Sequence, residues 1–116
     1  MLYYIQQKER GLITMTPIYN AKTLRQVTTN ARIAEYNRIK NEYVPVVLCK
    51  VNEANFAAAN AGFQSSMDNF NLLCMGLTTE ESQNYLKNGL KTELEELGFN
   101  VKIELNNSML KVTCKW

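Results

Sequence analysis

The apolar residues in the first half of the chain recur with a helical period. From Asn20, a residue suited to cap a helix N-terminus, to Tyr43 there is no Gly or Pro. Four apolar residues fall on one helical face at 100° per residue: Leu24, Val27, Ala31 and Ala34. Because a residue before Pro disfavours the helical conformation, we expect this helix to break at Val44-Pro45. A second helix is predicted from Pro45 to Gly62, a residue type that commonly follows a helix C-terminus.

The second half alternates between strand and helix patterns. Residues 63–75 are strand-like, with one apolar face made by Phe70, Leu72 and Cys74. A helix is then predicted to start with Thr78 as N-cap and Glu81 completing a capping box. It carries an apolar stripe and ends at Gly98; the stripe consists of Tyr85, Leu86, Leu90, Leu94 and Leu97.

A β-hairpin is predicted at the end of the chain. Apolar residues alternate with polar ones on both sides of a turn at Asn106-Asn107-Ser108: Phe99, Val101, Ile103 and Leu105 before it, and Leu110, Val112, Cys114 and Trp116 after it. The elements together predict an α+β domain with two N-terminal helices followed by β-α-β-β. Its three-stranded, largely antiparallel sheet would be covered by helices on one face. A chain of 116 residues has room for one such core.

Residues 1–14 have two interpretations. The stretch Lys8-Glu9-Arg10-Gly11 can be encoded by a purine-rich string of the kind found in bacterial ribosome-binding sites, and Met15 follows shortly after it. On this hypothesis 1–14 is translated upstream sequence and 15–116 is the native domain. The alternative is an ordinary N-terminal strand from Leu2 to Ile5.

Composition restricts the chemistry more than it restricts the fold. The chain has no His, which removes the commonest general base, the commonest metal ligand and every Ser-His or Cys-His nucleophile pair. The glycines are isolated, so no phosphate-cradling loop is present. We therefore predict a protein that is not an enzyme, with no catalytic residue, metal site or cofactor. Cys49, Cys74 and Cys114 are expected to be reduced, small apolar fillers. No apolar run approaches the ~18 residues of a membrane span, so no membrane partner is expected.

Charge is distributed unevenly along the chain. Residues 1–50 hold eight Lys or Arg against three Glu, whereas residues 51–116 hold five against eight Asp or Glu. On the first helix a basic stripe lies roughly opposite the apolar face and consists of Lys22, Arg25, Arg32, Tyr36 and Lys40. Such a stripe could bind a nucleotide or a phosphate backbone. An ordinary solvated helix face is the interpretation we favour, because this excess of charge is modest for nucleic-acid binding.

A protein interface is the other candidate site. The second helix combines small residues with asparagines at Asn52, Asn55 and Asn60, a surface suited to a partly hydrated contact. Trp116 is a candidate interface anchor because Trp is enriched among residues that dominate binding energy. Ordinary surface for the asparagines and a core position for Trp116 are the alternatives.

From Met15 onward the chain resembles small uncharacterised proteins encoded by tailed bacteriophages. The matching pieces are Ala21-Lys22, the Ala-rich second helix, Leu97-Gly98-Phe99-Asn100-Val101 and Val112-Thr113-Cys114-Lys115-Trp116. Cys114-Lys115 departs from the small polar pair usual in that family. The resemblance implies a phage accessory protein in the cytoplasm of an infected bacterium, or a minor virion part. Its partner would be a host or defence protein, and it could form a homo-oligomer; a nucleotide or nucleic acid is the less favoured partner.

Overall fold

The computed structural model describes the backbone of residues 2–9 and 12–116, and side chains from Ile18 onward. The chain divides into two units, Met1–Ala34 and Glu35–Trp116. In the first unit β1 (Leu2–Glu9) pairs antiparallel with β2 (Leu12–Tyr19), and α1 (Ala21–Arg38) begins immediately afterwards. The choice between Met1 and Met15 as the native start stays a prediction, and residues 1, 10 and 11 of that segment lie outside the described part.

The N-terminus of α1 is capped as its sequence predicts. Asn20 accepts a hydrogen bond from the backbone N–H of Thr23 through its Oδ1, at 2.8 Å. None of the residues of α1 is buried, which includes its apolar stripe. The Asn20 cap therefore accounts for the start of this helix. Among the described residues, its apolar face stays exposed.

The predicted helix break at Val44-Pro45 is wrong. The helix continues from α1 through a π-helical turn, η1 (Ile39–Tyr43), into α2 (Val44–Asn60). Val44 keeps helical dihedral angles and donates its N–H to the carbonyl of Ile39, five residues earlier. Pro45 has no N–H to donate. It stands in the first turn of α2, where the hydrogen bonds within α2 do not require one. The wider turn accommodates the proline without ending the helix.

The π turn also determines which residues face the core. Ile39 and Val44 are five positions apart, which on a regular α-helix would point them in directions about 140° apart. Both are buried, Ile39 at 0% and Val44 at 3% exposure, because the extra residue in the turn brings them onto one side. Val47 and Val51 continue that side along α2.

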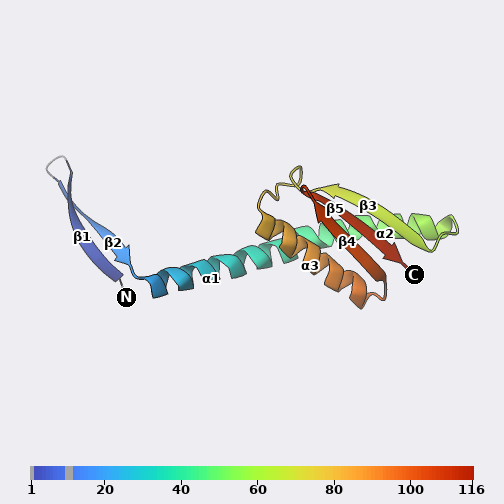
Figure 1. The fold of residues 1–116 in the computed structure, drawn as a ribbon, viewed down its shortest axis with the longest axis horizontal. Helices are drawn as coiled ribbons and strands as arrows, with labels where there is room; N and C mark the ends of the chain where they lie inside the picture. Colours follow the sequence, from blue (N-terminus) through green and yellow to red (C-terminus); the bar gives the residue numbers. More distant parts are fainter. Residues whose placement is uncertain (1, 10–11) are drawn as a thin grey trace. The chain divides into compact units, whose positions relative to one another are not determined.

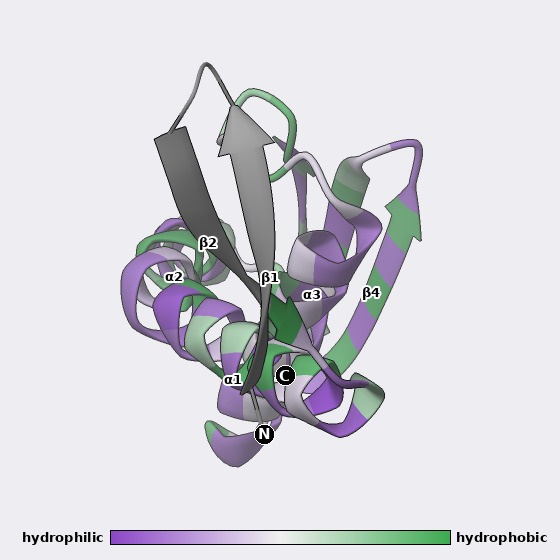
Figure 2. Cartoon of the chain, turned by 90° about the vertical axis from the view of Figure 1, so that its left-hand side faces the viewer, coloured by the Kyte–Doolittle hydropathy of each residue, from purple (hydrophilic) through white to green (hydrophobic). Residues whose placement is uncertain are grey.

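In the second unit β5 (Met109–Lys115) lies between β3 (Ser65–Asn71) and β4 (Asn100–Asn106), antiparallel to both (Figure 1). The α+β class with a three-stranded antiparallel sheet is therefore confirmed. The alternation that predicted the hairpin is visible along β4 as alternating hydrophobic and hydrophilic bands (Figure 2). Asn107 and Ser108 form the turn with positive φ angles of 50° and 63°.

The core of this unit lies between the sheet, α2 and α3 (Glu80–Glu96). Its α3 side is the predicted leucine stripe, and its strand side is the inward set of β5; the fully buried members of the two sets are Leu86, Leu90, Leu94, Leu110, Val112 and Cys114. Gly89 of α3 packs closely against α2, since a Cβ built on it would lie 3.0 Å from Val44 Cγ2.

Several local predictions need correction. The N-cap of α3 is Thr79 rather than Thr78, and its Oγ1 accepts the N–H of Ser82 at 3.2 Å. Leu97 follows the helix and is 57% exposed. Strand β3 ends at Asn71, because residues 72–75 form turns.

The cysteines behave differently from one another. All three are free thiols, but Cys49 and Cys74 are exposed, so the prediction that they are apolar fillers is wrong for these two. Cys74 falls in the turns after β3, beyond the regular alternation that suggested an inward position. Cys114 is fully buried, as expected.

Candidate binding surface on helix α2

The side of α2 that faces away from the core carries large apolar groups. Phe56 lies about 145° around the helix from the centre of the buried valine side, and 70% of it is exposed. Cys49 and Pro45 are exposed on the same side, and Leu48 is half-buried at its edge. Since a large exposed aromatic side chain on a helix is a departure from the usual distribution, this side is a candidate for contact with a partner.

Two adjacent grooves share Asn52 and Phe56. The first is a shallow, open depression along α2 alone, about 540 Å³ in volume, and is lined by Pro45, Leu48, Cys49, Asn52, Glu53 and Phe56. The second has a volume of about 430 Å³ and is lined by Asn52, Asn55, Phe56, Ala59, Phe99 and Trp116. Phe56 therefore stands between two apolar depressions that run along α2 to the C-terminal end of the sheet.

Trp116 forms one wall of the second groove. Its backbone N–H donates to the carbonyl of Gln64 at 3.0 Å, which fixes the end of the chain beside the start of β3. Its ring meets the ring of Phe99 edge-on, with centroids 6.1 Å apart and an interplanar angle of 80°. Trp116 is 40% exposed, so it is a partly open wall and not a core residue.

The three candidate asparagines occupy three different environments. Asn52 is half-buried and lines both grooves. Asn55 is only 6% exposed, and its Oδ1 accepts a hydrogen bond from the Ser66 hydroxyl of β3. Asn60 is exposed at the end of α2 and lines neither groove. The structure thus brings Asn52 and Trp116 to one surface, gives Asn55 a role in joining α2 to β3, and leaves Asn60 apart.

Asn55, which lines the second groove, also interacts with Cys114, which lies near the carboxylate of Asp68. Burial raises the pKa of the Cys114 thiol, and the nearby Asp68 carboxylate adds to that rise, whereas the Asn55 amide opposes it. Burial likewise raises the pKa of Asp68. A thiol with a raised pKa stays protonated at neutral pH and is a poor nucleophile. Cys114 is therefore not suited to act as a nucleophile beside the groove.

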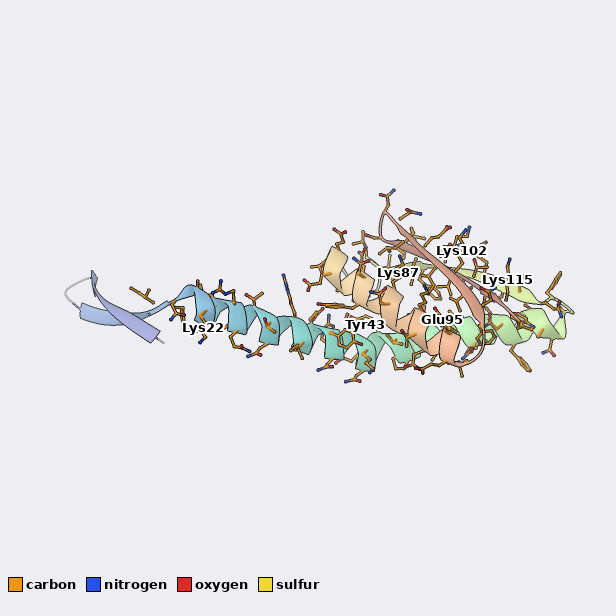
Figure 3. All side chains as sticks on the ribbon, turned by 60° about the horizontal axis from the view of Figure 1, so that its bottom comes forward. Lys22, Tyr43, Lys87, Glu95, Lys102 and Lys115 are labelled. Carbon is orange, nitrogen blue, oxygen red and sulfur yellow. The ribbon has the colours of Figure 1, made fainter. Side chains whose placement is uncertain are left out.

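The predicted basic stripe is divided between the two units. Three of its residues lie exposed on α1 within the first unit: Lys22, which Figure 3 labels, Arg25 and Arg32. The first turn of α1 has no acidic residue. Tyr36 and Lys40 belong to the second unit. The structure therefore does not bring the five residues together in one described unit.

The environment of Tyr36 and Lys40 differs from that of a free basic face. The ring of Tyr36 meets the ring of Tyr85 edge-on at 5.5 Å between centroids. Lys40 lines a depression together with Glu93 and Glu96 of α3. Acidic neighbours lower the positive potential around Lys40, which weakens the case for anion binding at this end of the stripe.

An ion pair near η1 was not foreseen from the sequence. Arg38 donates two hydrogen bonds to the Glu35 carboxylate, at 2.7 and 2.9 Å, and its guanidinium lies 5.3 Å from the ring centroid of Tyr43. The bonds from Arg38 hold the pKa of Glu35 below its ordinary value. The three-residue spacing of Glu35 and Arg38 is the sequence signal for this ion pair, because residues three apart are neighbours on a helical surface.

The outer face of the sheet is open and mainly polar. Its exposed or half-exposed residues include Lys102, Glu104, Lys111, Thr113 and Lys115, and Figure 3 labels Lys102 and Lys115 on these strands. Lys102 pairs with Glu104 at 3.1 Å, and this contact lowers the pKa of the Glu104 carboxyl. The partial neutralisation leaves a face of moderate charge and without an aromatic side chain among its lining residues.

Comparisons with known proteins add no assignment. No family model matches the chain, and neither the curated proteins nor the solved structures contain a match. Among the described residues no helix has both the length and the apolar character needed to cross a membrane. In the same part of the chain, Cys, Asp and Glu side chains form no group of three that could hold a metal ion.

Proposed function

We propose that this protein is a non-enzymatic binding protein that takes an apolar segment of a partner protein into the grooves on α2. The observation that carries the proposal is the position of Phe56. It is 70% exposed and separates two apolar depressions whose far wall is Trp116. Large aromatic side chains are prominent among the residues that dominate the free energy of protein–protein contacts.

The chemistry of the lining defines the segment that fits. The walls are aromatic and aliphatic, and the polar groups at the surface are the Asn52 amide and the Glu53 carboxylate. A partner segment with two or three large apolar side chains would fill the apolar walls. A flanking hydrogen-bonding or basic group would pair with Asn52 or Glu53. The resemblance to small phage proteins supports an accessory role in an infected bacterium, with a host or defence protein supplying this segment.

A photo-crosslinking amino acid in place of Phe56 tests the proposal in infected or expressing bacteria. We expect it to capture a protein, and we expect the same amino acid in place of Phe63 to capture much less of it. Phe63 is a matched control because it is 64% exposed just beyond α2 but lines neither groove. With the captured protein purified, Phe56→Ala should weaken binding by at least about 30-fold, the size of a dominant interface contact. Equal capture at both positions, or unchanged affinity of Phe56→Ala, would contradict the proposal.

The alternative function is nucleotide or nucleic-acid binding through the basic residues of α1. It is favoured by the absence of acidic residues between Ala21 and Ala34, where Lys22, Arg25 and Arg32 stand. A salt titration separates the two functions, because binding to phosphates through three cations loses roughly 40-fold in affinity between 50 and 200 mM salt, whereas an apolar contact changes little. Replacing Arg25 and Arg32 by Ala should abolish binding only under the alternative.

A further inference from the structure

The first part of α1 has an apolar face that is exposed among the residues whose side chains the structure describes. Leu24 is 50% exposed and Val27 is 55% exposed, and Ala31 and Ala34 are also exposed. We call these four residues the α1 stripe. An amphipathic helix normally obtains most of its stability from burying such a face.

The sequence of this segment makes the need for packing stronger. Thr23, Thr28, Thr29, Asn30 and Ile33 are all poor helix formers. Thr28 and Thr29 also donate their hydroxyl hydrogens to the carbonyls of the preceding turn, at 2.9 Å each. Such bonds compete slightly with the helix. Most helical stability in proteins comes from packing of an apolar face, so a partner that covers the stripe would stabilise this helix.

The spacing of the stripe fits another helix as the partner, and the flanking charges and residue sizes favour a second copy of the same helix. The four residues are separated by three, four and three positions, the spacing of the packed seam in a coiled coil. The flanking residues include Thr28 and Asn30, which are uncharged, while Arg25 and Arg32 point away from the seam. An acidic partner would bind the basic side of the helix and leave the stripe uncovered. Two copies can cover it without bringing like charges into contact.

Residue size determines the direction of the second helix. The stripe has its two large members at one end, Leu24 and Val27, and its two alanines at the other. In an antiparallel pair, Leu24 meets Ala34 of the second copy and Val27 meets its Ala31, so every layer contains one large and one small side chain. A parallel pair would place large against large and alanine against alanine, with uneven helix separation. The antiparallel pair also opposes the two helix dipoles.

We propose that the protein forms a two-fold symmetric dimer through the α1 stripe, with the two α1 helices antiparallel and residue 29 at the centre of the contact. This dimer is independent of the α2 grooves and of the partner proposed for them. The surfaces that recognise another protein would thereby be presented in two copies.

The test uses the full chain with Cys49 and Cys74 replaced by Ser, because both are exposed and would react with a spin label. Single labels are placed at Lys22→Cys and, separately, at Arg25→Cys, and the distance between the two copies is measured by pulsed electron resonance. In the antiparallel pair position 22 lies opposite position 36, and position 25 opposite position 33. At 1.5 Å per residue the axial separations are about 21 and 12 Å, so the measured distance should shorten markedly from the first label to the second.

Light scattering provides the second measurement. We expect a mass of twice 13.3 kDa for the unlabelled chain, and at least a tenfold weaker dimer for Val27→Asp. Ile33→Ser is the control, since Ile33 is 54% exposed on the opposite side of α1 and should leave the dimer intact. A monomeric wild-type chain would overturn the proposal. A monomer that binds lipid vesicles through the α1 stripe would overturn it as well. Equal distances for the two labels would overturn the antiparallel arrangement.

Discussion

Gly89 offers a sharp test of how closely α3 and α2 pack. In a helix interior, Gly is about 1 kcal/mol less favourable than Ala, so Gly89→Ala would stabilise an isolated helix. A Cβ at this position would lie 3.0 Å from Val44 Cγ2, which is well inside the optimal separation of about 3.5–4.0 Å. Val44 is 3% exposed and is held beside the π turn, so it has little room to move. Since overpacking costs about 1–3 kcal/mol, we expect a net loss of about 1 kcal/mol.

A double-mutant cycle isolates this contact. Val44→Ala deletes the crowding methyl group and a second one, at a cost of about 1.6 kcal/mol from the transfer of two methyl-sized groups. In the double variant the methyl group added at position 89 fits the vacated space, and the helix gains its higher propensity. The double variant should therefore be about 2 kcal/mol more stable than the sum of the single effects predicts.

Urea denaturation measures all the variants. The fluorescence of Trp116, the single Trp of the chain, reports the second unit, which contains both substituted residues. Asn88→Ala is the matched control, because Asn88 is exposed on the same helix, and it should gain about 0.5 kcal/mol from propensity alone. A full gain of about 1 kcal/mol for Gly89→Ala, together with additive effects in the cycle, would refute the close contact between Gly89 and Val44.

Three further predictions concern stability. Thr79→Ala should cost about 1 kcal/mol by removing the cap on Ser82 N–H, whereas Thr78→Ala should change little; thermal unfolding of both variants checks which threonine caps α3. Asp68→Asn should stabilise the chain slightly at pH 7, because burial raises the folded-state pKa of this carboxyl and so penalises its ionised form, although solvent screening keeps the gain small. The penalty disappears as the pH falls through the folded pKa and below the unfolded one, so the gain should vanish in acid; a constant gain would contradict this cause. Leu90→Ala should cost about 2–5 kcal/mol by denaturant unfolding, since Leu90 is fully buried.

Much of the second unit follows from sequence patterns alone. The leucines of α3 and the β5 residues Leu110, Val112 and Cys114 are buried as their periods predict. The inward residues of β4 are half-buried, Trp116 is exposed, and Asn107-Ser108 adopts the positive φ angles expected of that turn. These patterns succeed because helix and strand periods depend on local geometry. The continuation of the helix through Pro45 could not be predicted in the same way, since it depends on a π turn that the contact of Ile39 and Val44 with the core stabilises.

The candidate site was only partly visible in the sequence. Trp116 and Asn52 were predicted as interface residues and line the same groove. Phe56 was missed, although an aromatic residue opposite the valine side of α2 was an available signal. Phe99 could not be recognised as a wall of the groove, because its position depends on how the end of the sheet meets α2 and Trp116.

The turn between α1 and α2 has a consequence for how the chain unfolds. Regular helices transmit order from one turn to the next through an unbroken ladder of hydrogen bonds. At residues 39–43 the hydrogen bonds change to the spacing of a π-helix, and Pro45 just after them has no N–H to donate. We therefore expect the backbone amides of α1 to exchange with solvent much faster than those of α2, with an abrupt change at η1. The helical residues from Ala21 to Asn60 are therefore expected to unfold as two cooperative parts, which separate at η1.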